Sequence, residues 1–215
     1  ANAENNTKYN FQGIFDGNGY SISGLYCKSP NDFVGLFGCL GAYGEVKNVK
    51  VVNSYFEASG ALGSIVARCE GKIDTAYSDA YLMENAHLGG GIAGYKLTDN
   101  VSKITNCWYD GVLTVGDTAR LCGGIMGRLL KGTVEMEACL FTGKIVIDGE
   151  LRTANIGGFL GNVAAGTVSV KNSLNSGEFV LSEAEKINAV GRVFGQVAND
   201  ENITITIEDS YFMDF

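Results

Sequence analysis

A five-residue block recurs six times along this 215-residue chain, and it constrains the fold more than any other feature. Most copies begin and end with glycine and carry aliphatic or aromatic residues between. The copies are VGLFG (34–38), GSIVA (63–67), GGIAG (90–94), GGIMG (123–127), GGFLG (157–161) and GRVFG (191–195). Self-similarity at a period of about 30 residues indicates a repeat architecture, in which each unit buries its apolar face against its neighbours.

A second segment follows each block, and a looser third segment restarts at a glycine. The second segments are EVKNVKV from 45, KIDTAYS from 72, KITNCWYDG from 103, VEMEACLFTG from 134, VSVKNSLNSG from 168 and ITIEDSYF from 205. About three short strands per unit, without a convincing amphipathic helix, predict an all-β fold: a right-handed parallel β-helix, or β-solenoid, of about six coils. A propeller blade needs about 40 residues, so that architecture fits less well.

We expect residues 1–215 to form a single β-helix domain. Within it, residues 1–32 form an N-terminal entry or cap segment, and residues 33–215 form six repeats of about 27–34 residues. The polar start of the chain is typical of a trimmed end. We therefore expect the domain to be a fragment of a longer polypeptide.

Stacked repeats turn equivalent apolar residues into interior ladders. One predicted ladder contains Leu36, Ile65, Ile92, Ile125, Phe159 and Val193, and another contains Val46, Ile73, Ile104, Met136, Val170 and Ile207. Cys107 and Cys139 occupy a column where other coils use Val, Ala or Ser. We therefore expect the cysteines to be buried free thiols that pack as small hydrophobes, although a disulfide between neighbouring coils is the alternative.

A further apolar column directly follows the first ladder, although neighbouring residues in an extended strand face opposite sides. This column contains Phe37, Val66, Ala93, Met126, Leu160 and Phe194. Either loops or a bulge bring the column inside, or it is an exposed stripe that docks another domain or partner. On the second alternative, Phe37, Met126 and Phe194 belong to a partner surface.

The stretch FDGNGYSI near the N-terminus is rich in turn-forming residues. Its central residues are Asp16, Gly17, Asn18 and Gly19. Asn-Gly is a strong turn signal, so we predict a structural turn or hairpin cap with Phe15 and Ile22 directed to the core. A calcium loop is the alternative, but the later ligands of an EF-hand are missing.

The sequence assigns no catalytic, cofactor-binding or metal-binding residues. The one histidine, His87, lies in no catalytic motif, and no paired-cysteine zinc pattern occurs. GGGIAG (89–94) matches a dinucleotide-binding pattern, but no helical segment follows it. A formal net charge of −8 without a basic cluster disfavours nucleic acid, and no apolar run is long enough for membrane insertion in this segment.

Acidic and aromatic residues raise the alternative of a carbohydrate-active β-helix. Polysaccharide cleavage needs two carboxylates held across the scissile bond. The candidates are Asp74, Asp79, Asp110, Glu135, Glu137 and Asp209. Tyr77, Trp108 and Tyr211 occupy comparable repeat positions and would form a sugar-stacking strip, although the intervening coils carry no aromatic residue at that position.

One column of the repeat is mostly polar and is predicted to be a turn position whose side chains bond backbone groups. It contains Asn48, Thr75, Asn106, Ala138, Asn172 and Asp209.

The motifs of the first 51 residues resemble a known repeat family. FQGIFDGNGYSISGL, followed by VGLFGCLGAYGEVKNVKV and the later GGIAG-type blocks, is similar to the GLUG-motif repeats of bacterial cell-surface proteins, which also occur in adhesin-like chains and IgA-peptidase-type surface proteases. The resemblance covers about residues 11–215, and later units match more loosely. It implies a parallel β-helix and no catalytic residues.

From this resemblance we expect a non-catalytic module on a bacterial cell surface or in a secreted protein. It would act as a rigid spacer or as an adhesin-like or partner-binding domain. Its expected partners are a host glycan or surface protein, together with flanking domains of the same polypeptide. A carbohydrate-active module, either a glycan binder or a lyase-like or hydrolase-like enzyme, remains the alternative.

Overall fold

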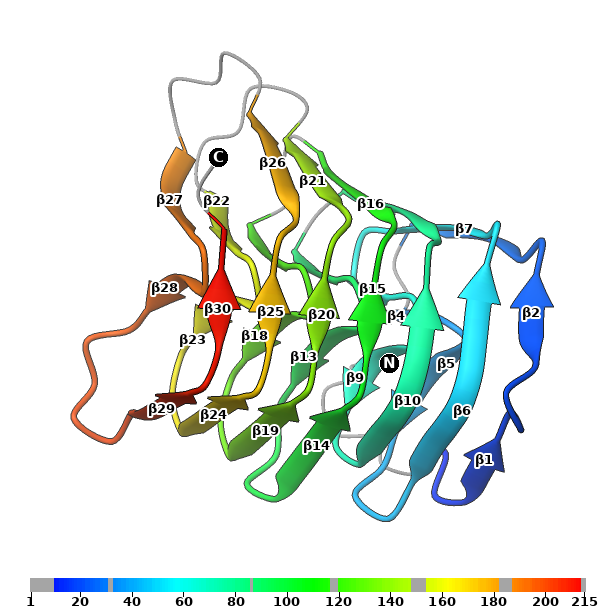
Figure 1. Cartoon of the computed structure of the whole chain (residues 1–215), viewed down its shortest axis with the longest axis horizontal. Coiled ribbons are helices and arrows are strands. Elements are labelled where there is room, and N and C mark those ends of the chain that lie inside the picture. Colours follow the sequence, from blue (N-terminus) through cyan, green and yellow to red (C-terminus); the bar gives the residue numbers. More distant parts are fainter. Residues whose placement is uncertain are drawn as a thin grey trace.

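A computed structural model describes residues 10–30, 33–85, 87–116, 120–147, 154–181 and 187–213. These residues form an all-β parallel solenoid, and the described part contains no helix. Coils stack from β1 (Ile14–Asp16) and β2 (Ser21–Ser23) at one end to β29 (Thr204–Glu208) and β30 (Tyr211–Phe212) at the other (Figure 1). The predicted cap segment, residues 1–32, is described only from residue 10 to 30.

Four parallel sheets form the sides of the solenoid. The first sheet has 12 strands: β1, β2, β6 (Glu45–Val52), β10 (Lys72–Ser78), β14 (Val101–Thr105), β15 (Trp108–Tyr109), β19 (Thr133–Glu137), β20 (Leu140–Phe141), β24 (Thr167–Lys171), β25 (Leu174–Asn175), β29 and β30. The second has six: β3 (Tyr26–Ser29), β7 (Tyr55–Ala58), β11 (Tyr81–Glu84), β16 (Val112–Val115), β21 (Lys144–Ile147) and β26 (Glu178–Leu181).

The remaining two sheets meet at a sharp corner. The third contains β4 (Phe33–Val34), β8 (Ala61–Gly63), β12 (Leu88–Gly90), β17 (Leu121–Gly123), β22 (Ala154–Gly157) and β27 (Ile187–Gly191). The fourth contains β5 (Phe37–Leu40), β9 (Val66–Cys69), β13 (Ala93–Lys96), β18 (Met126–Leu129), β23 (Leu160–Val163) and β28 (Phe194–Val197). The six strands in each of these sheets correspond to about five complete turns, slightly fewer than the six coils expected. The right-handedness of the solenoid stays a prediction.

The predicted interior ladders are present. Ile73 pairs in register with Val46 and Ile104, and all three are fully buried. Ile207, on the outermost strand β29, is 47% exposed because no further strand covers it among the described residues. The cysteines are free thiols, of which Cys69, Cys107, Cys122 and Cys139 are buried. The packing role is thus confirmed for these four, whereas Cys27 is exposed.

The five-residue block spans a corner rather than one strand. The second apolar column therefore turns inward, which was one of its two predicted alternatives, and the other alternative, a partner surface, is wrong. In the third repeat, β12 ends at Gly90 and β13 begins at Ala93, so both Ile92 and Ala93 face the interior. Met126 of the same column is fully buried and belongs to no surface. Phe37 and Phe194 are half-buried and pack against the core. Each coil therefore contributes to four sheets, whereas about three strands per repeat were expected.

The N-terminal stretch forms a turn but not a hairpin. Both β1 and β2 run parallel to β6, so the chain does not reverse between them. Asn18 and Gly19 adopt positive φ values of 50° and 78°, and the Tyr20 amide donates to the Gly17 carbonyl. The Asp16 carboxylate accepts from the Asn18 amide at 2.9 Å. This tight turn bulges out of the first coil and returns the chain to the same direction.

The polar column coincides with a left-handed bend within the first sheet. All six of its residues have φ between 46° and 54°. The three asparagine side chains donate to carboxylates of the preceding coil rather than to backbone groups as predicted: Asn48 to Asp16 at 3.0 Å, Asn106 to Asp74 at 2.9 Å and Asn172 to Glu137 at 3.4 Å. Because Asn tolerates the left-handed region, its recurrence here follows from the backbone geometry.

Ala138, with φ of 51°, and Thr75, with φ of 52°, are the members of this column whose residue types do not favour the left-handed region. We expect Ala138→Asn to raise the free energy of unfolding by about 0.5–1 kcal/mol, because Asn is less strained than Ala in this conformation. Urea unfolding of the two proteins measures the difference. The same substitution at Ala58, which is buried at the end of strand β7 and has no positive φ, serves as a control and should destabilise. A variant no more stable than the parent at position 138 would contradict this account.

Candidate functional site

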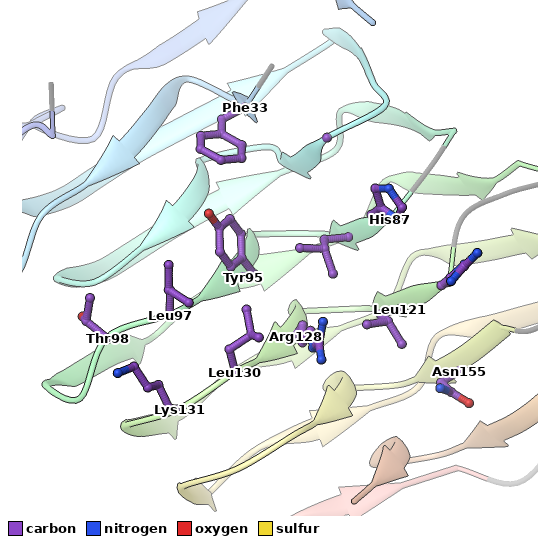
Figure 2. Close-up of a pocket in the computed structure, with 13 residues that line it drawn as sticks. Phe33, His87, Tyr95, Leu97, Thr98, Leu121, Arg128, Leu130, Lys131 and Asn155 are labelled. Carbon is purple, nitrogen blue, oxygen red and sulfur yellow. The ribbon is translucent and has the colours of Figure 1, made fainter. Parts of the chain in front are cut away.

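A groove of about 960 Å³ runs along the outside of the solenoid where the third and fourth sheets meet. Figure 2 shows its side chains: one row comes from the third sheet and another from the fourth sheet and the turns that follow it. The lining residues are Phe33, Gly60, His87, Leu88, Tyr95, Leu97, Thr98, Arg120, Leu121, Arg128, Leu130, Lys131 and Asn155.

The walls of the groove are register columns of the solenoid. Leu88 pairs with Leu121, and Leu121 pairs with Asn155, on consecutive strands of the third sheet. Tyr95 pairs with Arg128 on the fourth sheet. Five coils, from Phe33 to Asn155, contribute to the first wall, and four spacings of about 4.8 Å give a length of about 19 Å.

Apolar residues form the middle of the groove. Tyr95 is 4% exposed and belongs to a hydrophobic cluster separate from the main core. Partly buried Leu88, Leu97 and Leu130 pack against this cluster, and the Phe33 ring lies 5.6 Å from that of Tyr95. This region lies outside the coil interior, and the partly exposed Leu88, Leu97 and Leu130 leave apolar surface open to contact with a ligand.

The charged groups around the groove are cationic. Arg128 is half-buried, its Nε donates to Asn162 Oδ1 at 3.1 Å, and burial lowers its pKa. Lys131 is exposed and pairs with Asp99 at 2.9 Å. Arg120 and His87 add exposed basic side chains, and no Asp or Glu is among the described lining residues. The groove therefore differs in sign from the chain as a whole, which carries −8.

A buried ionic network supports the edge of the groove. Glu70 Oε1 accepts from Arg68 Nε at 2.8 Å, and Glu70 Oε2 accepts from Lys96 Nζ at 3.0 Å. The Leu97 amide, the Thr98 amide and the Thr98 hydroxyl also donate to the Glu70 carboxylate. Burial alone would raise the pKa of Glu70, but the hydrogen bonds of Thr98 and Arg68 and the charge of Lys96 lower it. This network holds the turn that carries Leu97 and Thr98 into the groove.

A second, smaller cavity of about 360 Å³ lies on the outer face of the first sheet. Tyr77 and Trp108 line it, paired in register with ring centroids 4.9 Å apart and an edge-to-face angle of 69°. Trp108 is 40% exposed, and its Nε1 donates to Thr142 Oγ1 at 2.6 Å. Burial, followed by Asp79 and Asp110, raises the pKa of Tyr77. Tyr211 occupies the same column but is separated from Trp108 by two coils.

The carboxylates considered for catalysis are engaged with neighbours on the same sheet. Glu135 forms an ion pair with Lys103 at 2.7 Å. Asp74 accepts from Thr105 at 2.7 Å and from Asn106 at 2.9 Å. Glu137 accepts from Asn172 at 3.4 Å. These contacts are ladder interactions between neighbouring coils, one of them an ion pair and three of them hydrogen bonds from neutral donors.

The groove itself was missed by reasoning from the sequence. The residue after the last glycine of the block, Tyr95 in one repeat and Arg128 in the next, faces the groove. Most residues at this position are polar, in contrast to the glycine and apolar residues of the block before it, and this contrast is the signal that marks the position as outward-facing. The position is occupied by Cys39, Arg68, Tyr95, Arg128, Asn162 and Gln196. Among the described residues, no helix could cross a membrane, and no group of three or more metal-binding side chains gathers.

The fold has a counterpart in a bacterial crystal structure. A protein described as a "putative immunoglobulin A1 protease" from Bacteroides ovatus matches 92% of this chain with a TM-score of 0.71 and 22% identity. A "Putative Gly-rich membrane protein" of Evansella cellulosilytica is 34% identical over 68 residues, 30% of this chain. This chain spans 59% of the first protein and 8% of the second. No family model matches the chain.

At 22% identity the structural likeness shows the β-solenoid fold alone. It agrees with the architecture that the GLUG resemblance implies. The specific repeat family is matched by no family model.

Proposed function

We propose that this chain is a non-catalytic GLUG-type repeat module of a bacterial surface or secreted protein, which holds a partner in the groove and spaces the domains that flank it. The groove is the observation that carries the proposal. It collects an apolar floor and cationic side chains from successive coils along about 19 Å, which suits an extended ligand better than a compact one.

The similar proteins support the setting. One is described as a protease that would act on an immunoglobulin and the other as a membrane protein, and both descriptions fit a surface location. A parallel solenoid is stiff because every interior strand is hydrogen-bonded on both edges. Such a rod holds a binding surface at a set distance from its neighbours.

A combined binding and turnover assay tests this role. The chain is offered to arrays of extended peptides and oligosaccharides, and mass spectrometry follows the bound and soluble material. We expect retention without accumulating products, and a loss of retention when Leu130→Ser removes part of the apolar floor. Lys103→Gln, on the first sheet, is the matched control and should bind normally. Products that increase with time, or retention indifferent to Leu130→Ser, would contradict the proposal.

The cavity beside Trp108 favours one second candidate, a glycan-binding role. An exposed indole fixed by Thr142 offers the apolar face that a sugar ring stacks on, and Asn18, Asn48 and Asn106 line the same cavity.

Trp108 is the single tryptophan of the chain, so its fluorescence reports directly on this cavity. We expect a saturable change in its emission during titration with a sugar that binds there, and Tyr77→Ala should abolish the change. Emission that stays constant across a panel of neutral, acidic and amino sugars would refute the glycan role.

A further inference from the structure

We infer that the groove binds an extended polypeptide segment that carries acidic and apolar side chains. This inference rests on the proposed binding role of the groove and names the class of its ligand.

Arg128 specifies the charge of the ligand. Its guanidinium is half-buried on β18, and the Asn162 side chain that accepts a hydrogen bond from its Nε is neutral. No carboxylate among the described residues forms an ion pair with it. A partly desolvated guanidinium is costly unless an anion accepts its planar set of donors, and a carboxylate matches that geometry in two parallel hydrogen bonds. Arg120 and Lys131 beside it extend the positive field, although Asp99 offsets Lys131.

The apolar floor distinguishes a peptide from a polysaccharide. Four leucines line the groove, namely Leu88, Leu97, Leu121 and Leu130, and branched aliphatic side chains pack well against the aliphatic side chains of a peptide. The sugar-stacking alternative would use exposed aromatic faces, but Tyr95 is 4% exposed and its ring is engaged by Phe33.

The length and form of the groove fit an extended chain. About 19 Å of wall accommodates about six residues of extended polypeptide at about 3.3 Å each. An extended segment therefore places alternate side chains on the leucines and on Arg128.

Fluorescence anisotropy with defined peptides tests the inference. The probes are labelled eight-residue peptides that alternate Leu with Glu, Leu with Gln, or Leu with Lys, and polygalacturonate serves as an unlabelled competitor. We expect the Glu peptide to bind at least about tenfold more tightly than the Gln peptide and more weakly as salt rises, and the Lys peptide not to bind.

Two variants separate charge from apolar contact. Arg128→Gln should remove the preference for Glu over Gln while leaving binding of the Gln peptide unchanged, which a misfolded protein could not do. Leu130→Ser should weaken both peptides, and Lys103→Gln should change neither.

The outcomes distinguish the inference from the proposed function. A groove that binds the Gln peptide equally well, or that binds polygalacturonate in preference, overturns the acidic-peptide inference but leaves the binding module in place. Peptide binding that ignores both Arg128→Gln and Leu130→Ser, or no binding of any probe, overturns the inference and removes the support for the groove.

Discussion

Glu70→Gln is expected to lower the free energy of unfolding by about 3–5 kcal/mol. Glu70 is 2% exposed and is the carboxylate that balances buried Arg68 and Lys96. Removing its charge leaves Arg68 and Lys96 buried without the carboxylate that balances them, which costs far more free energy than a surface ion pair contributes. The Thr98 and Leu97 donors also lose a charged acceptor.

Urea unfolding followed by circular dichroism measures this effect. Glu135→Gln is the matched control, because Glu135 and Lys103 are each more than 40% exposed and their pair should contribute less than about 1 kcal/mol. Similar losses of unfolding free energy in the two variants would show that the buried network stabilises the fold no more than a surface ion pair does.

The pH dependence carries a second signature of Glu70. Its pKa is lowered from the ordinary value of 4.5 in the folded protein, so its stabilising contribution is complete above about 4.5. That contribution is lost as the pH falls through the folded value, where protonation breaks the network. We therefore expect the parent protein to lose stability on acidification more steeply than Glu70→Gln does, since the variant has no such proton to bind.

Gly123→Ala is expected to destabilise the solenoid by about 3 kcal/mol. Gly123 stands at the corner between the third and fourth sheets, where the column above and below it is also glycine. A Cβ here would lie 2.8 Å from Gly161 N and 2.9 Å from Phe159 O, and closer still to Met126 O. These are backbone atoms held by hydrogen bonds between coils, so the clash can be relieved only by shifting strands.

Gly38→Ala provides the control for this substitution. A Cβ on Gly38 would make only an ordinary contact, 3.4 Å from Phe33 O, and its neighbour in the stack, Ala67, already carries one. We expect the control to change the free energy of unfolding by less than about 0.5 kcal/mol. Thermal and urea unfolding of both variants decide the matter, and equal stability of Gly123→Ala and the parent would disprove the close approach of the two sheets.

Much of the fold could be predicted because its cause is periodic. A repeat of about 30 residues with apolar residues at fixed offsets leaves stacking as the economical way to bury them, and Val46, Ile73 and Ile104 meet in register as expected. The corner was not predicted, because GGIAG has no residue that marks a bend inside it. An extended block would place Met126 on the surface and a bulge would bring it inside, so the sequence left both alternatives open; Met126 is fully buried.

The candidate site consists of residues that the corner brings together, so less of it could be predicted from the sequence. Lys96 pairs in register with Leu129 and is completely buried, a position where the sequence pattern favours an aliphatic residue. Its partner Glu70 is 26 residues away, in the preceding coil. Tyr77 and Trp108 were recognised as a pair because they share a strand position, which needs only the repeat. The groove needs two sheets, and no local pattern reports their angle.

Because each coil adds one residue to the wall, the length of the groove is proportional to the number of coils. Adding or removing a coil would change its length by about 4.8 Å without altering the corner that forms it. The glycine column keeps the frame constant, while the residue facing outward changes from Tyr95 to Arg128 to Asn162 along the stack. Repeat proteins built this way can therefore vary the length of the groove, and the ligand side chains that the groove recognises, without changing the scaffold.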